Sequence, residues 1–166
     1  MLGKPCFCIL VVSDSVYKGL CRDVSGARAR EVLSRLGYSV REHVVVPNSY
    51  REIHARILGF VKQGCDAILV IGGTGPSPRD ISVDVVEELS WRSLPGFGEL
   101  FRRLSFDREG YVAVYTRAAA YLVGDSVVFV VPGSPRALEI ALDIIVNTVD
   151  HIVEEVRRYE GRHGGA

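Results

Sequence analysis

Residues 72–80, with the sequence GGTGPSPRD, form a segment that could hold a phosphorylated ligand. The segment follows an apolar run and precedes a helical pattern, so its glycines let backbone amides approach an anion without intervening side chains. Pro78 stands where the dinucleotide-binding motif needs its third glycine, and no Gly-Lys-Ser/Thr follows, so the segment is neither that motif nor a P-loop. The alternative is a tight turn in which Asp80 caps the following helix.

Residues 94–99, with the sequence LPGFGE, place two glycines around an aromatic residue before a helical pattern resumes. A loop of this kind could lay its backbone against a flat ring, although Phe97 is by type more often an anchor in the hydrophobic core. Arg117, after a short predicted strand, and Arg136, in the first turn of the last predicted helix, could pair with phosphate oxygens. The alternative for both arginines is a solvated surface position.

Strands and helices alternate along the chain and would position these segments. The apolar runs Cys6–Val12, Ala67–Ile71 and 127–131 are typical of parallel strands covered on both faces. Ser39–Val46 carries charged residues among its apolar ones, which favours a more exposed strand. The alternation predicts an α/β fold with a mostly parallel central sheet between layers of helices.

Helix ends are marked by residues that cap them. Gly37 stops the first apolar helical pattern, and Ser49 with Glu52 three residues later predicts a capping box at the start of the next. Ser134 is expected to cap the last helix, with Pro135 in its first turn.

Right-handed crossovers place every strand-to-helix loop at one edge of a parallel sheet, which is where ligands bind in open α/β folds. We therefore expect four loops to meet at this edge, namely residues 13–15, 47–49, 72–80 and 132–134.

The composition of the chain indicates which partners and which cellular location to expect. Twenty basic residues balance twenty acidic ones, so neither nucleic acid nor an anionic membrane is an expected partner. We expect no signal peptide and no membrane span, and hence a soluble, cytoplasmic protein. The length of 166 residues predicts a single domain over residues 1–160, with residues 161–166 as a disordered tail.

The four cysteines lack Cys-x-x-Cys spacing, so reduced thiols are expected rather than a metal or redox centre. The four histidines also lack ligand-like spacing, and none is assigned to catalysis.

Several short blocks follow one another along the chain: SDS at 13–15, DVSG at 23–26, GGTGP at 72–76 with Arg79 and Asp80, LPGFGE at 94–99, TRA at 116–118 and PGSP at 132–135. Taken in this order, they resemble the MogA/MoaB family of molybdopterin-binding proteins, which includes the G domain of gephyrin. Residues 101–106 look more like the MoaB branch than the MogA branch.

The resemblance implies a three-layer α/β/α fold, a homotrimer or homohexamer, and transfer of AMP from ATP to molybdopterin with Mg²⁺. Asp80 matches the family's essential aspartate and is the expected metal ligand, and Asn48 stands where the family has a second aspartate. These two are the expected catalytic residues. The positions that match the ligand-binding loops are Ser13, Asp14, Ser15, Gly72, Gly73, Thr74, Gly75, Pro95, Gly96, Phe97, Gly98, Glu99, Thr116, Arg117, Pro132, Gly133, Ser134 and Pro135.

Three positions depart from the family pattern: Asn48 replaces an aspartate, Thr116 a serine and Val130 an asparagine. A phosphate monoester with a second pKa of about 6 is already ionised at neutral pH, so adenylyl transfer needs positioning and a metal rather than a strong base. Asp80 can supply the carboxylate, while Asn48 would either weaken metal binding or belong to the start of a helix. Two hypotheses remain, an active adenylyltransferase and a non-catalytic molybdopterin-binding or assembly protein.

Overall fold

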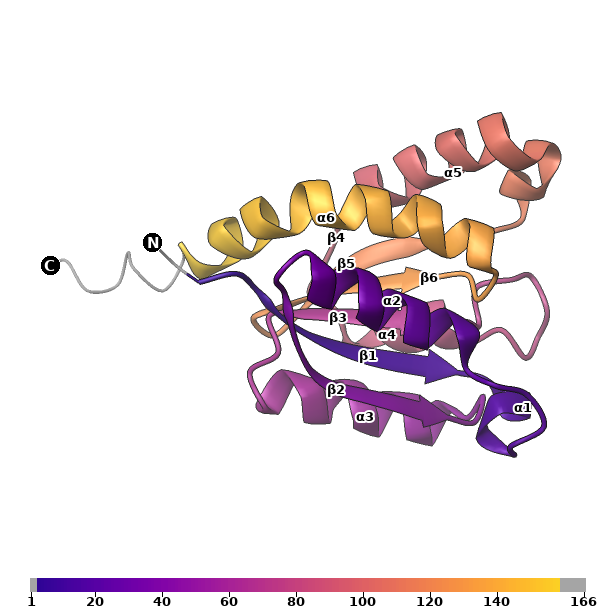
Figure 1. Cartoon of the computed structure of the whole chain (residues 1–166), viewed down its shortest axis with the longest axis horizontal. Coiled ribbons are helices and arrows are strands. Elements are labelled where there is room, and N and C mark those ends of the chain that lie inside the picture. The colour runs from indigo at the N-terminus through magenta and orange to yellow at the C-terminus, as the bar shows by residue number, and fades with distance from the viewer. Residues whose placement is uncertain (1–2, 159–166) are drawn as a thin grey trace, which may run out of the picture.

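A computed structural model describes residues 3–158 as a six-stranded sheet between two layers of helices (Figure 1). The strands lie in the order β2-β1-β3-β6-β5-β4, and the first four of these are parallel. β5 is antiparallel to β6, and β4 to β5. The bounds are β1 Cys6–Val12, β2 Ser39–Val46, β3 Ala67–Ile71, β4 Arg92–Ser93, β5 Ala119–Val123 and β6 Ser126–Val131.

Helices α2 (Val24–Arg35), α5 (Pro95–Glu109) and α6 (Pro135–Arg157) cover one face of the sheet. Helices α3 (Tyr50–Lys62) and α4 (Ser82–Leu89) cover the other. The expected three-layer α/β/α fold with a mostly parallel sheet is therefore confirmed. Two short elements complete it, α1 (Asp14–Tyr17) and the 3-10 helix η1 (Gly110–Val114). Within residues 3–158, no helix combines the length and apolarity needed to span a bilayer.

The continuous apolar runs are explained by burial on both faces of the sheet. Along β1, Phe7 and Ile9 join the core under α2 and α6, while Cys8 and Leu10 join the core over α3 and α4. β2 lies at the edge of the sheet and keeps partly exposed charged residues, as its sequence predicted. The polar tail expected at residues 161–166 lies outside the described residues.

The helix caps were predicted with mixed success. The Ser134 hydroxyl accepts a hydrogen bond from the amide of Ala137 at 3.3 Å, which confirms the cap of α6. Ser49 is the N-cap residue of α3, but its side chain makes no capping hydrogen bond, so the predicted capping box is wrong in that respect.

The glycines at 96 and 98 do not form a loop, because α5 already begins at Pro95. Phe97 is 8% exposed, and its ring centroid lies 5.2 Å from that of Phe129 in β6. A side chain at Gly98 would place its Cβ 2.7 Å from the carbonyl oxygen of Ala118, so glycine allows α5 to pack closely beside β5. Phe97 is thus the core anchor that the sequence offered as the alternative.

The short strand expected before Arg117 is also absent from the described fold. Residues 110–114 form η1 instead, and strand β5 begins only after Arg117, at Ala119. The β-branched and aromatic residues of this segment favour a strand locally, but it packs against α5 rather than pairing with the sheet.

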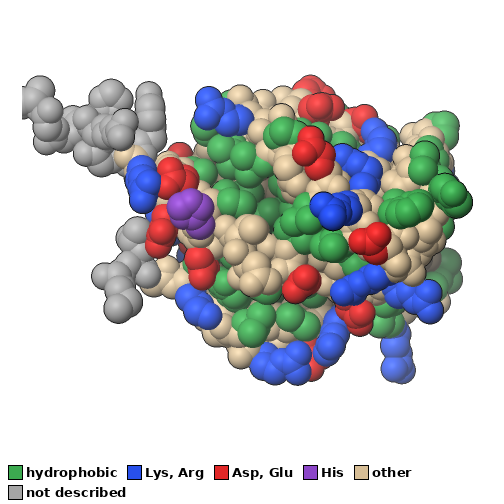
Figure 2. All heavy atoms as spheres, turned by 90° about the horizontal axis from the view of Figure 1, so that it is seen from above, with side chains coloured by type: hydrophobic (Ala, Val, Ile, Leu, Met, Phe, Trp, Pro, Cys, Tyr) green, Lys and Arg blue, Asp and Glu red, His purple; other side chains and the backbone are tan. Residues whose placement is uncertain are grey.

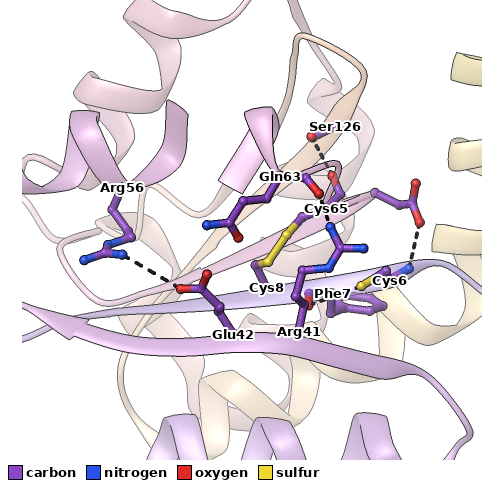
Figure 3. Close-up of a disulfide and its surroundings, with 10 residues drawn as sticks. Cys6, Phe7, Cys8, Arg41, Glu42, Arg56, Gln63, Cys65 and Ser126 are labelled. Atoms are coloured by element: carbon purple, nitrogen blue, oxygen red, sulfur yellow. Dashed lines mark hydrogen bonds and ion pairs between the residues drawn. A yellow bond between two sulfur atoms is a disulfide. The ribbon is translucent and has the colours of Figure 1, made fainter. Parts of the chain in front are cut away.

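Cys8 and Cys65 form a disulfide, which corrects the expectation of four reduced thiols. Figure 3 shows the bond linking Cys8 in β1 to Cys65, which lies two residues ahead of β3. The two Cα atoms lie 6.0 Å apart. The carbonyl oxygen of Cys65 also accepts a hydrogen bond from the Ser126 hydroxyl at 2.7 Å. A pair separated by 57 positions has no spacing signature, because its proximity depends on how β1 and β3 are paired. Cys6 and Cys21 are free.

The disulfide predicts a stability that depends on redox conditions. Closing a loop of this length stabilises a folded protein by about 4 kcal/mol in the chain-entropy model. We expect the free energy of unfolding, measured by denaturant titration, to fall by about this amount when the wild type is reduced. The double variant Cys8→Ala/Cys65→Ala should not respond to reductant, whereas Cys21→Ser should behave as the wild type. Equal stability of oxidised and reduced wild type would contradict this prediction.

Candidate functional site

The turn after β3 is shaped so that only glycine fits at its first two positions. Gly72 and Gly73 have φ angles of 105° and 71°, which other residues rarely adopt. A Cβ at Gly72 would lie 2.4 Å from the carbonyl oxygen of Val12, and one at Gly73 would lie 2.2 Å from the Ser82 hydroxyl. The glycine turn, residues 72–75, therefore packs directly against the end of β1 and the start of α4.

The carboxylate of Asp80 lies against this turn. Its Oδ2 accepts a hydrogen bond from the Ser77 amide at 3.2 Å, and a Cβ at Gly75 would come within 2.6 Å of the same oxygen. The N-cap residue of α4 is Ile81, and no side chain caps that helix. Asp80 is therefore not the helix cap that was the alternative reading of this segment, and its side chain borders the open edge of the turn.

A cavity of about 270 Å³ opens beside the glycine turn, between the start of α6 and the elements α5 and η1. Asp80 and the amide-rich turn border one side, and side chains from α5 and η1 border the other. Its lining residues are Gly73, Thr74, Gly75, Pro76, Asp80, Phe101, Ser105, Glu109, Val112, Ala113, Tyr115, Thr116, Pro132, Gly133, Ser134 and Ala137.

A second cavity, of about 310 Å³, lies on the other side of Gly133, against the end of β1 and the start of α2. Asp23 lines it and caps α2, because its Oδ1 accepts a hydrogen bond from the Gly26 amide at 2.8 Å. Its other oxygen, Oδ2, lies 2.6 Å from Nε2 of His43 on β2. A Cβ at Gly26 would lie 2.3 Å from this oxygen, so glycine makes room for the pair.

The loops after β1, β2 and β3 are joined by a small hydrogen-bonded network. Asp14 accepts a hydrogen bond from the Asn48 amide at 2.9 Å and pairs with the Arg79 guanidinium. The side-chain amide of Asn48 donates to the Arg79 carbonyl, while its Oδ1 is buried without a partner among the described residues. The loops at 13–15, 47–49 and 72–80 thus meet at one edge, as their place in the fold predicted. Gly133 borders the cavities on both sides of this edge.

Arg117 holds the glycine turn in place through side-chain hydrogen bonds. Its guanidinium donates two hydrogen bonds to the Asp84 carboxylate, at 2.8 and 2.9 Å, and its Nε donates to the Gly75 carbonyl at 3.2 Å. A further hydrogen bond reaches the carbonyl of Asp80. Hydrogen bonding to Arg117 lowers the pKa of Asp84, and the same contact raises the pKa of Arg117. Its donors therefore hold protein groups, and Arg117 is not among the residues lining the cavity.

The structure gathers some of the predicted ligand-binding residues and separates others. Residues 95–99 lie in the first turn of α5 and line neither cavity. Hydrogen bonds within the surrounding loops are made by four further predicted residues, which also line neither cavity: Asp14, Ser15, Asn48 and Arg117. Ser13, Gly72 and Pro135 line the second cavity. Those that line the cavity at the glycine turn are Gly73, Thr74, Gly75, Asp80, Thr116, Pro132, Gly133 and Ser134. Their roles in binding remain predictions.

Sequence reasoning missed the wall that α5 and η1 contribute. Phe101, Ser105 and Glu109 follow one another at intervals of four, so they lie on one face of α5 and line the cavity together. That spacing was visible in the sequence, but nothing in it indicated that this face borders a cavity rather than the core.

The parallel sheet, the glycine turn at its carboxyl edge and the adjoining carboxylate place this chain among α/β proteins with a pocket at the carboxyl edge of the sheet. Residues 8–151 match the family described as a probable molybdopterin binding domain. Because the match covers most of the chain, the protein belongs to this family, and the resemblance drawn from its motifs is confirmed.

Individual relatives are similar over nearly their whole length. A molybdopterin adenylyltransferase from Pyrococcus furiosus is 37% identical over 158 residues, which cover 91% of this chain and 90% of the relative. A molybdenum cofactor biosynthesis protein B from Halalkalibacterium halodurans is 36% identical, with 89% and 88% covered. The crystal structure of the tungsten cofactor synthesizing protein MoaB from Pyrococcus furiosus has a TM-score of 0.89 at 34% identity, covering 95% of this chain and 99% of that one.

The brace behind the glycine turn predicts a small pH-dependent stability. Because the folded protein lowers the pKa of Asp84 below its ordinary 3.8, the Arg117 contact stabilises the fold at neutral pH, and this contribution is lost as the pH falls through the lowered pKa. The Asp84 side chain is 57% exposed, so we expect about 1 kcal/mol or less. Urea titrations should show Asp84→Asn less stable than the wild type at about pH 7 and less stable by a smaller margin at about pH 2.

Asp107→Asn, an exposed change on α5, is the control for the loss of one carboxylate. A stability difference between Asp84→Asn and the wild type that is the same at both pH values would contradict an ionic role for Asp84.

Proposed function

We propose that this protein transfers the AMP part of ATP to the terminal phosphate of molybdopterin and releases pyrophosphate in a Mg²⁺-dependent reaction. The observation that carries the proposal is the Asp80 carboxylate at the open edge of the glycine turn, beside a cavity of about 270 Å³. The name of the adenylyltransferase from Pyrococcus furiosus supports it, as does the molybdopterin-binding description of the family.

The chain's own contribution is to position charged groups. Residues 73–75 of the glycine turn line the cavity, and we propose that their backbone amides hold phosphate oxygens. An ionised terminal phosphate needs no general base to attack the α-phosphorus of ATP. Arg117 donates hydrogen bonds to the carbonyls of Gly75 and Asp80, so it holds the glycine turn and the Asp80 carboxylate in a fixed position relative to each other. The rate enhancement would come from this preorganisation.

The residues present fit Mg²⁺ carried largely by the substrates. The described residues contain no cluster of three or more histidine, cysteine or acidic side chains that could hold a metal by themselves. Mg²⁺ usually binds through one or two carboxylates together with phosphate oxygens and water, and Asp80 supplies one such carboxylate. When bound, the ion would neutralise charge on the phosphate oxygens.

Asn48 serves this site as a brace rather than as a second anionic ligand. Its amide group holds the carbonyl of Arg79, the residue that precedes Asp80, and its backbone is held by Asp14. An aspartate at this position would lose the donor that reaches Arg79. The geometry of the loop is therefore kept without a second carboxylate, and we propose that the metal is bound more weakly as a result.

Pyrophosphate release tests the proposed reaction. Purified protein with ATP, Mg²⁺ and molybdopterin should release pyrophosphate, and omission of either molybdopterin or Mg²⁺ should stop it. Asp80→Ala should lower kcat by roughly a hundredfold or more, because it removes the metal ligand. Asp107→Asn should retain full activity. Molybdopterin binding without turnover by the folded wild type would overturn the proposal in favour of a non-catalytic binding or assembly protein.

We further propose a homotrimer or homohexamer that works in the cytoplasm, where ATP is made and used. Apolar side chains stand in solvent at the junction of α5 and η1, including Tyr111 at 79% and Val114 at 76% exposure. Figure 2 shows hydrophobic side chains gathered at the right-hand end of the face that carries α2, α5 and α6. Such a patch is typical of a protein–protein interface. Both cysteines of the disulfide are buried, which shields the bond from cytoplasmic thiols.

Substitutions in this patch test the oligomer. Light scattering should give a mass of three or six chains of 18.2 kDa for the wild type. Tyr111→Asp combined with Val114→Asp should shift the mass toward that of one chain, because charge in a packed interface is costly. A wild type that runs as a single chain at all concentrations would contradict the proposal. Trp91→Asp, at an exposed aromatic residue elsewhere, should leave the mass unchanged.

A further inference from the structure

The cavity beside the glycine turn has two chemically different ends. At one end lie the backbone of the turn, the Asp80 carboxylate and the start of α6. At the other end lie the apolar side chains of Phe101 from α5, Val112 from η1 and Tyr115, which directly follows η1. A ligand that carries a phosphate on one side and a flat ring on the other would match both ends.

Ser105 is an unpaired polar group within the apolar end. The residue is 3% exposed, and its hydroxyl has no hydrogen-bond partner among the described residues. A buried hydroxyl without a partner is uncommon, because burial removes its hydrogen bonds to water. Since Ser105 lines the cavity, a ligand could complete this missing hydrogen bond.

Glu109 lies one helical turn beyond Ser105 and lines the same cavity. It is half-buried, and no ion pair to its carboxylate is found within residues 3–158. Glu109 is also the last residue of α5, where the helix dipole disfavours a negative charge. Helix stability therefore does not explain an acid at this position, whereas a ligand with hydrogen-bond donors would.

We propose that this end of the cavity binds the pterin ring of the substrate, with Glu109 and Ser105 recognising the edge that carries the 2-amino and 4-oxo groups; the assignment rests on the proposed function. That edge presents two adjacent N–H donors, at N3 and the 2-amino group, which match the two oxygens of a carboxylate. The neighbouring 4-oxo group accepts a hydrogen bond, and the Ser105 hydroxyl can donate one.

The same pair of residues discriminates against adenine. Beside its amino group, adenine presents a ring nitrogen that is an acceptor, so a carboxylate placed there would face a lone pair. Unpaired or repulsive polar groups in a buried site are a strong source of selectivity. With the pterin held between α5 and η1, the phosphate of the same molecule would extend toward the glycine turn and Asp80.

Calorimetric titration with two probes tests this assignment without any turnover. The probes are 6-hydroxymethylpterin monophosphate, which carries the ring edge and one phosphate, and AMP. Glu109→Gln should raise the Kd of the pterin probe by roughly tenfold or more, and Ser105→Ala should raise it by several-fold, because each change removes a hydrogen bond to the ligand. Neither change should alter AMP binding. Asp107→Asn, an exposed acid on the same helix, should bind both probes as the wild type does.

Thermal unfolding separates a ligand role from a structural one. Because the Ser105 hydroxyl is unpaired, Ser105→Ala should leave Tm unchanged or raise it while it weakens pterin binding. Loss of AMP binding in Glu109→Gln with pterin binding intact would overturn the proposal, as would unchanged binding of both probes or no pterin binding by the wild type. Intact pterin recognition without pyrophosphate release would refute only the proposed transfer reaction.

Discussion

Close packing of the glycine turn against its neighbours is the constraint on which the candidate site depends. Any side chain at Gly72 would collide with the backbone at the end of β1, and any at Gly73 would collide with Ser82 at the start of α4. The turn can therefore lie flat between these two elements. The Gly72 amide donates to the Val131 carbonyl at 2.9 Å, and residues 73–75 line the cavity. Arg117 then ties the carbonyls of Gly75 and Asp80 to one guanidinium. The acidic side chain at position 80 is held by the backbone around it, so its location does not depend on a ligand.

The fold was largely predictable because burial on both faces leaves a strong signal in the sequence. The bounds of β1, β2 and β3 agree with the apolar runs, and β6 begins one residue earlier than expected, at Ser126. Strands β4 and β5 went unrecognised, and the segment before Arg117 was taken for a strand instead. In these segments local β-propensity is a poor guide, since pairing with a neighbouring strand decides the conformation.

The site was predictable where topology alone determines it. Loops that follow parallel strands must share an edge, which is why the turn at 72–75 and the start of α6 border one cavity. The opposite wall of the cavity was missed because Ser105 and Glu109 come from α5. The periodicity of a helix does not predict its angle to the sheet. The disulfide was missed for a similar reason, since only the three-dimensional placement of the segment before β3 beside β1 brings Cys65 to Cys8. Asn48 and Arg117 were assigned to ligand contacts, yet their donors hold carbonyls of the loop.

A crystal of the protein soaked with Mn²⁺ and a non-hydrolysable ATP analogue tests the central claim most directly, because the anomalous signal of manganese locates the metal without ambiguity. The account predicts a peak about 2.1 Å from a carboxylate oxygen of Asp80, with phosphate oxygens completing the coordination beside the glycine turn. A metal bound by the nucleotide elsewhere, with the carboxylate still engaged only by the Ser77 amide, would contradict it.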